Sequence, residues 1–137
     1  MNKPLNIELS YLLKKKGFDE KCDNGWYLPH PEIAIKNGVE PNTWIKLPIN
    51  PLLNQIKAPT ISEVISWLYE KHNIYIHISP HGDDETLFKD CEWWFSIYRN
   101  KLYNLCAGSK VTPGIEGFKS IEQAYTAAIE YILNNLI

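Results

Sequence analysis

The sequence predicts an α+β fold: a three-layer α/β/α sandwich around a small antiparallel sheet, with an α-β-β-β-α unit in its C-terminal half. The first observation is that the spacing of apolar residues changes twice from residue 59 onward. Apolar residues recur at helical spacing, then at alternate positions in three short segments, and then at helical spacing again. The second is an additional amphipathic segment near the N-terminus, which needs a surface to cover and supplies the third layer. We expect 1–137 to form a single domain, with a helix and an irregular proline-rich segment over 1–58 and the α-β-β-β-α unit over 59–137.

The composition indicates a soluble globular protein. A chain of 137 residues can bury roughly two-thirds of the surface that it exposes when unfolded. Hydrophobic residues make up 45% and charged residues 22%, which is typical of folded rather than disordered chains. The net charge of -2 gives no general attraction for nucleic-acid phosphates, and no apolar run approaches the roughly 18 residues of a membrane span. The three cysteines are widely spaced, which favours reduced thiols inside a cell.

The first predicted helix runs from about Ile7 to Lys16. Asn6 is placed to cap its N-terminus, and Gly17 supplies the left-handed residue that commonly follows a helix. Three lysines, 14–16, lie at its C-terminal end, where cations complement the helix dipole. The alternative interpretation of these lysines is an anion-binding patch.

The segment 19–58 carries the weakest signals. Its five prolines exclude a long helix. Asn37 and Gly38 form a tight-turn signal between residues 33–35 and Val39, which predicts a short hairpin. Residues 43–47 predict one more short strand.

The C-terminal unit has clear helix signals at both ends. Thr60 and Glu63 form a capping box at the start of a helix that ends near Asn73. Ser120 and Gln123 stand in the same register at the start of the last helix. Between the helices, three segments alternate as strands do: Ile74–Ser79, Trp93–Tyr98 and Leu102–Cys106.

One face of the predicted sheet is a candidate binding surface. Isoleucines alternate along the first strand and face the two helices, so Tyr75 and His77 point the other way, together with Trp94 and Tyr98 from the next strand. A face this aromatic needs a cover, because large exposed apolar patches usually mark an interaction site. The N-terminal helix would cover most of it, or part of it stays open as a binding groove or a dimer surface.

The connection after the first strand is a candidate metal site. Imidazole and carboxylate groups of five residues lie within a short stretch and could bind a divalent metal: His77, His81, Asp83, Asp84 and Glu85. Their spacing matches neither a zinc pattern nor a calcium loop, and glycine, proline and aspartate are ordinary loop formers. We therefore expect no bound cofactor, and keep a metal-dependent enzyme as an alternative.

Other catalytic signals are weak. Cys22, Cys91 and Cys106 coexist with four histidines, but no nucleophile signature surrounds any of the cysteines. The glycines fit no phosphate-binding fingerprint. We predict no catalytic residues and no enzymatic activity.

The order of helix, three strands and helix also occurs in double-stranded RNA-binding domains. Those domains begin their last helix with a lysine cluster that contacts phosphates. Residues 117–122 contain one lysine instead, and the acidic loop 83–85 would repel a duplex. Nucleic-acid binding is therefore disfavoured, and it stays an alternative.

Several short segments carry a resemblance to known proteins: 58–60, 67–68, 71–74, 93–95, 120–124, 128–131, Leu136, and 12–19 near the N-terminus. In these segments the chain resembles small phage and prophage proteins of gut bacteria, and the phage α-β-α sandwich domain family. The resemblance implies the sandwich fold and a location in the cytoplasm of the bacterial host, and it implies no known activity. Residues 118–130 are also similar to the helix of HicB-type antitoxins, which favours an antitoxin-like regulatory module as an alternative.

The sequence thus predicts a binding protein. Five tryptophans and eight tyrosines are a surplus of the residue types enriched at interface hot spots. We expect a protein partner, including a second copy of the chain as a homodimer, and no membrane contact.

Overall fold

The computed structural model describes residues 2–100, 104–108 and 117–137, which divide into two compact units, Asn2–Thr60 and Ile61–Ile137. Both units mix helices with a small antiparallel sheet, so the predicted α+β class is confirmed. The division falls close to the predicted boundary between 58 and 59. That the two parts act as a single domain stays a prediction.

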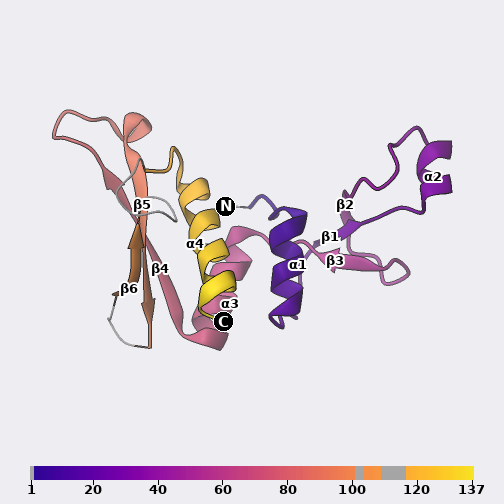
Figure 1. The fold of residues 1–137 in the computed structure, drawn as a ribbon, viewed down its shortest axis with the longest axis horizontal. Helices are drawn as coiled ribbons and strands as arrows, with labels where there is room; N and C mark the ends of the chain where they lie inside the picture. The colour runs from indigo at the N-terminus through magenta and orange to yellow at the C-terminus, as the bar shows by residue number, and fades with distance from the viewer. Residues whose placement is uncertain (1, 101–103, 109–116) are drawn as a thin grey trace. The chain divides into compact units, whose positions relative to one another are not determined.

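The N-terminal unit consists of two helices and three short strands (Figure 1). Their bounds are α1 Ile7–Lys15, β1 Asn24–Tyr27, α2 Pro31–Lys36, β2 Ile45–Pro48 and β3 Gln55–Lys57. The strand β1 lies in the middle and pairs antiparallel with both β2 and β3. The predicted strand over 43–47 is confirmed by β2, shifted toward the C-terminus.

The predicted ends of α1 are confirmed. The side chain of Asn6 accepts a hydrogen bond of 2.9 Å from the amide of Leu9. Gly17 has a φ of +88°, a left-handed conformation that glycine adopts at little cost. The amide of Phe18 then donates to the carbonyl of Leu13 at 3.0 Å, so the chain reverses over the end of the helix.

The predicted hairpin around Asn37 and Gly38 is wrong, because residues 33–35 lie in the helix α2. Pro31 occupies its first turn, where a missing amide hydrogen costs nothing. His30 accepts a hydrogen bond from the amide of Glu32 at 3.3 Å. Asn37 caps the other end, and Gly38 follows with a φ of +72°. The pair that can turn a hairpin therefore ends a helix here.

The C-terminal unit contains the predicted helix, strands and helix. Their bounds are α3 Ile61–His72, β4 Ile74–His81, a short 3₁₀ turn Phe88–Asp90, β5 Glu92–Arg99, β6 Asn104–Gly108 and α4 Ile121–Asn135. The central strand β5 pairs antiparallel with β4 on one side and β6 on the other. Residues 102 and 103 of the predicted third strand lie outside the described residues.

Two of the predicted helix signals of this unit, Asn73 and Ser120, fall where expected. Asn73 follows α3 with a φ of +53°. Its carbonyl accepts the amide of Asn100 at 3.0 Å, which joins the start of β4 to the end of β5. Ser120 caps α4 by accepting the amide of Gln123 at 3.1 Å. Gln123 reaches back to the amide of Lys119, one residue before the position that a capping box uses.

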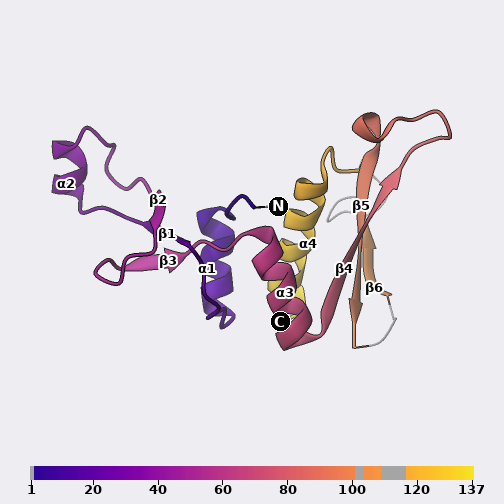
Figure 2. The same cartoon turned by 180° about the vertical axis from the view of Figure 1, so that it is seen from behind.

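Both helices of this unit cover the same face of its sheet (Figures 1 and 2). The side chains of β4 and β5 that face them are almost completely buried: Ile74, Ile76, Phe95 and Ile97. The buried faces of α3 and α4 are aliphatic apart from Trp67, and the small residues Ala124 and Ala128 of α4 are fully buried. The described residues of this unit thus form two layers, and the third layer of the predicted sandwich stays a prediction. Within the described part of the chain, each helix is too short or too polar to cross a membrane.

Candidate functional site

The candidate site is the outer face of the C-terminal sheet, by which we mean the side chains of β4 and β5 that point away from α3 and α4. They are Tyr75, His77, Ser79 and His81 on β4, and Glu92, Trp94, Ser96 and Tyr98 on β5. The register of the two strands places all four predicted binding residues on this face. The alternation along the strands fixes that placement, because successive side chains point to opposite faces.

The two tyrosines form a direct cross-strand pair at one end of the outer face. Tyr75 lies opposite Tyr98, with ring centroids 6.4 Å apart and planes inclined by 40°. Tyr75 is 49% exposed, while Tyr98 is half-buried. The pKa of Tyr125 on α4 is raised, mainly by burial and to a smaller extent by the electrostatic interaction with Tyr75. His77 is exposed and lies next to this pair, opposite Ser96.

A second aromatic pair lies at the other end of the outer face. The imidazole of His81 stacks on the indole of Trp94, with centroids 4.4 Å apart and planes inclined by 26°. Its Nε2 lies 3.2 Å from Oγ of Ser79, within hydrogen-bond distance. The sequence placed His81 in a loop, because the predicted strand ended at Ser79. The strand continues through Pro80, which an edge strand tolerates, and the alternation carried past that proline would have placed His81 on this face.

The backbone at Gly117 packs against the Trp94 end of the outer face. Its amide donates to the carboxylate of Glu92 at 3.0 Å. The next residue, Phe118, exchanges two backbone hydrogen bonds with Trp93, of 2.8 and 3.0 Å. The indole Nε1 of Trp94 is buried, and none of the described residues accepts a hydrogen bond from it.

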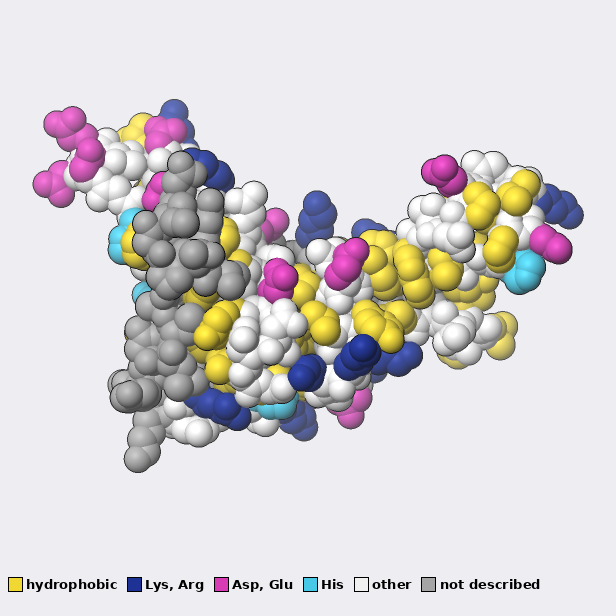
Figure 3. All heavy atoms as spheres, in the orientation of Figure 1, with side chains coloured by type: hydrophobic (Ala, Val, Ile, Leu, Met, Phe, Trp, Pro, Cys, Tyr) yellow, Lys and Arg dark blue, Asp and Glu magenta, His cyan; other side chains and the backbone are white. Residues whose placement is uncertain are grey.

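The acidic connection between β4 and β5 forms a self-contained turn. The carboxylate of Asp83 accepts the amide of Glu85 at 3.0 Å and the hydroxyl of Thr86 at 2.8 Å. The bond from Thr86, then that from Glu85, lowers the pKa of Asp83. Figure 3 shows acidic side chains gathered at the tip of this connection, at the upper left.

The candidate metal ligands are not gathered into a binding site. His77 lies beside Ser96, His81 stacks on Trp94, and Asp83 closes its own turn, while Asp84 and Glu85 are exposed. Among the described residues, no group of three or more His, Cys, Asp or Glu side chains is arranged to hold a metal ion. Cys22 and Cys91 are buried, and the thiol of Cys91 lies 3.1 Å from the carbonyl of Phe88. The side chain of Cys106 lies outside the described part of the structure.

His72 gives this unit a pH dependence that can be measured. It ends α3, and its ring meets that of Trp67 edge-on at 4.6 Å. Burial and, to a lesser extent, the positive charge of Arg99 lower the pKa of His72 below 6.5. Well above pH 6.5 the His72 ring is neutral in both the folded and the unfolded protein. Below pH 6.5 the unfolded chain binds a proton at His72 more readily than the folded chain does.

We therefore expect the free energy of unfolding to fall as the pH drops below 6.5, and the variant His72→Gln to lose part of that dependence. Urea unfolding at pH 7.5 and pH 5.0 measures the difference. The matched control is His77→Gln, because His77 is an exposed histidine of the same unit. Equal pH dependence in the wild type and in His72→Gln would contradict the prediction.

The chain matches no protein-family model, no curated protein and no solved structure.

Proposed function

We propose that this protein acts by binding another protein through the outer face of its C-terminal sheet, and that the partner is a second copy of the same chain. The observation that carries the proposal is the contrast between the two faces. Phe95 and Ile97 of β5 are at most 1% exposed under the helices, whereas Tyr75 on the outer face is 49% exposed. Tyrosine and tryptophan supply large contact areas at low entropic cost, which is why they are enriched in protein interfaces.

The edge of the sheet supports a partner that adds a strand. Among the described strands, β4 pairs only with β5, so one row of its main-chain donors and acceptors faces outward. Such an edge pairs readily with another extended chain. Pro80 removes one donor near the end of the strand, and residues 74–79 keep theirs.

The composition of β4 favours self-pairing. Residues 74–81 contain no aspartate, glutamate, lysine or arginine. Like charges directly opposite each other destabilise a strand pair. Antiparallel pairing of β4 with its copy would place no like formal charges opposite each other, so it avoids this cost. In a register that places outer-face residues opposite each other, pairing would also extend the outer face across both copies.

The charge balance disfavours the nucleic-acid alternative for the same surface. Residues 61–137 contain ten carboxylate side chains and six lysines or arginines. An acidic connection next to His81 adds to the repulsion of phosphates. A phage or prophage origin and a location in the bacterial cytoplasm stay predictions, as does an antitoxin-like role. The competing cover of the outer face is the N-terminal helix, which is the third layer of the predicted sandwich.

Light scattering across a dilution series tests the proposal. We expect a dimer at micromolar concentrations, and a dissociation constant raised about 5- to 30-fold by Tyr75→Ala, the effect of removing a hot-spot residue. The matched control is Tyr69→Ala, since Tyr69 on α3 is 60% exposed but lies off this face. A protein that stays monomeric up to a concentration of about 1 mM would contradict the proposed self-association. A dimer that Tyr75→Ala leaves unchanged would remove the outer face from the interface.

A further inference from the structure

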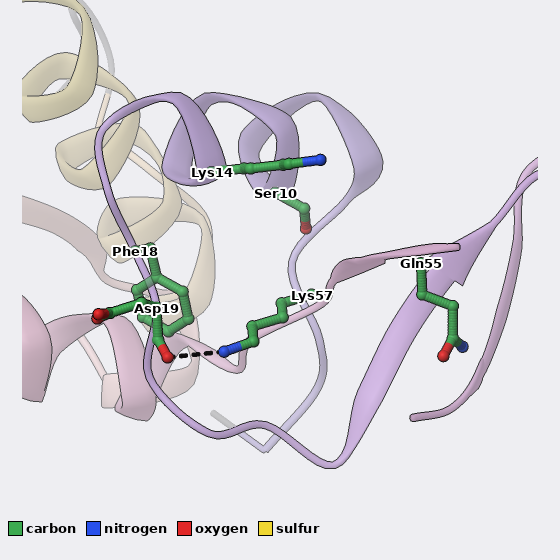
Figure 4. Close-up of a pocket in the computed structure, with 6 residues that line it drawn as sticks. All are labelled: Ser10, Lys14, Phe18, Asp19, Gln55 and Lys57. Atoms are coloured by element: carbon green, nitrogen blue, oxygen red, sulfur yellow. Dashed lines mark hydrogen bonds between the residues drawn. The ribbon is translucent and has the colours of Figure 1, made fainter. Parts of the chain in front are cut away.

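The N-terminal unit contains a pocket between α1, the turn that follows it, and β3 (Figure 4). Its volume is about 260 Å³, and its lining combines two ammonium groups, a hydroxyl, an amide, a carboxylate and a phenyl ring: Ser10, Lys14, Phe18, Asp19, Gln55 and Lys57. This volume lies just below the range of about 300–1,000 Å³ that is typical of ligand pockets, so it suits only a compact molecule. The outer face of the C-terminal sheet contributes nothing to it.

The ammonium group of Lys57 is held in place before any ligand arrives. Its Nζ donates to the backbone carbonyls of Asp19 at 2.7 Å and Glu20 at 2.8 Å. Figure 4 shows the side chain running from β3 back toward Asp19. An ammonium group has three hydrogens, so one remains for a ligand. Because the side chain is already fixed, binding costs little further side-chain entropy.

The lining carries a surplus of one positive charge. Lys14 on α1 is exposed and supplies a second ammonium group, against the single carboxylate of Asp19. Gln55 is uncharged and is already held by two hydrogen bonds, because its Nε2 donates to the carbonyl of Pro48 and its Oε1 accepts from the amide of Asn50. Two cations and one anion thus favour a ligand with one negative charge.

Ser10 is the only buried polar side chain among the described residues, at 1% exposure. Its hydroxyl lies 3.4 Å from the carbonyl of Leu5, at the limit of a hydrogen bond. That carbonyl already accepts a shorter bond, of 3.0 Å, from the indole of Trp26. The hydroxyl can therefore turn to a ligand in the pocket at little cost, since its present bond is weak.

We propose that this pocket binds a small organic carboxylate. The carboxylate group accepts the remaining hydrogen of Lys57, Lys14 adds a second positive charge at the pocket, and the apolar body of the ligand lies against the ring of Phe18. A single negative charge matches the surplus of the lining. A phosphate monoester carries about 1.5 to 2 negative charges at pH 7, more than the lining neutralises.

Titration of the full chain with benzoate, followed by amide chemical shifts, tests the proposal. We expect saturable binding, with shifts concentrated on α1, residues 17–20 and β3. Lys14→Met should weaken benzoate binding about tenfold, the loss of one charged contact, and Lys57→Met at least as much. The control is Lys46→Met, because Lys46 lies on β2 outside the pocket lining. Benzyl alcohol, which has the same ring without the charge, should bind at least tenfold more weakly.

Lys14→Met keeps the test decisive if the loss of the Lys57 clamp impairs folding, because Lys14 is exposed. Absence of saturation by benzoate would overturn the proposal, and so would equal affinity in the wild type and in Lys14→Met. Inorganic phosphate that binds as tightly as benzoate would reduce the pocket to a general cationic patch and contradict the carboxylate assignment.

Discussion

Replacing Phe95 by alanine is expected to lower the free energy of unfolding of the C-terminal unit by about 3–5 kcal/mol. Phe95 lies on the central strand β5, is 1% exposed, and is the largest fully buried side chain among the described residues. Its ring lies 6.1 Å from that of Phe118, so truncation removes aromatic contacts as well as buried area. Urea unfolding followed by circular dichroism measures the loss as a lower midpoint at an unchanged slope.

The control for this variant lies on the other face of the same sheet. Tyr75→Ala removes a ring that is half exposed and contacts Tyr98 across the strands, so we expect a loss below about 1 kcal/mol when unfolding is measured on the dilute monomer, below the dissociation constant of the dimer. Equal losses for Phe95→Ala and Tyr75→Ala would mean that both faces are buried in solution. Association can be measured only on a folded protein. A small loss of stability in Tyr75→Ala therefore means that this variant can be used to test the interface.

The sequence predicted the features that depend on neighbouring residues. Asn6, Gly17 and Ser120 act within three or four residues of the helix ends that they terminate, so their roles can be read locally. The two faces of the C-terminal sheet follow from alternation alone. Phe95 and Ile97 are buried for this reason, while Tyr75 is not.

The failures come from signals with two physical outcomes. Asn37 and Gly38 can turn a hairpin or end a helix, and the choice is made upstream by Pro31, which starts α2. The sheet of the N-terminal unit pairs β1 with strands that lie about 20 and 30 residues further along the chain. No local sequence pattern predicts which of these distant strands pair with β1.

Of the two candidate sites, the outer face could be predicted from the sequence and the pocket could not. The outer face was predicted because one strand carries Tyr75 and His77, and the next carries Trp94 and Tyr98. The pocket was not predicted, because Lys57 and Asp19 are 38 residues apart and meet only when β3 pairs with β1. An anion-binding patch that includes Lys14 was the alternative interpretation of the lysine run 14–16, but no sequence pattern joined Lys14 to Lys57.

Replacing Gly117 by alanine is expected to lower the free energy of unfolding of the C-terminal unit by about 1–3 kcal/mol, the range for overpacking. An added Cβ would lie 2.5 Å from Cβ of Glu92 and 2.8 Å from Nε1 of Trp94. Neither neighbour can move freely, because Glu92 belongs to the strand β5 and the indole of Trp94 is stacked on His81. The backbone at residue 117 must therefore move away, which strains the hydrogen bonds between Phe118 and Trp93.

The matched control is Lys119→Ala, two residues further on, where the side chain is exposed and an unchanged urea midpoint is expected. An unchanged midpoint for Gly117→Ala would mean that this backbone does not pack against Trp94 in solution. A loss of stability would instead show that the chain before α4 packs against the outer face, because the added methyl group would lie against the indole on which His81 is stacked. Gly117→Ala would then also raise the dissociation constant of a dimer formed through that face, and Lys119→Ala would not.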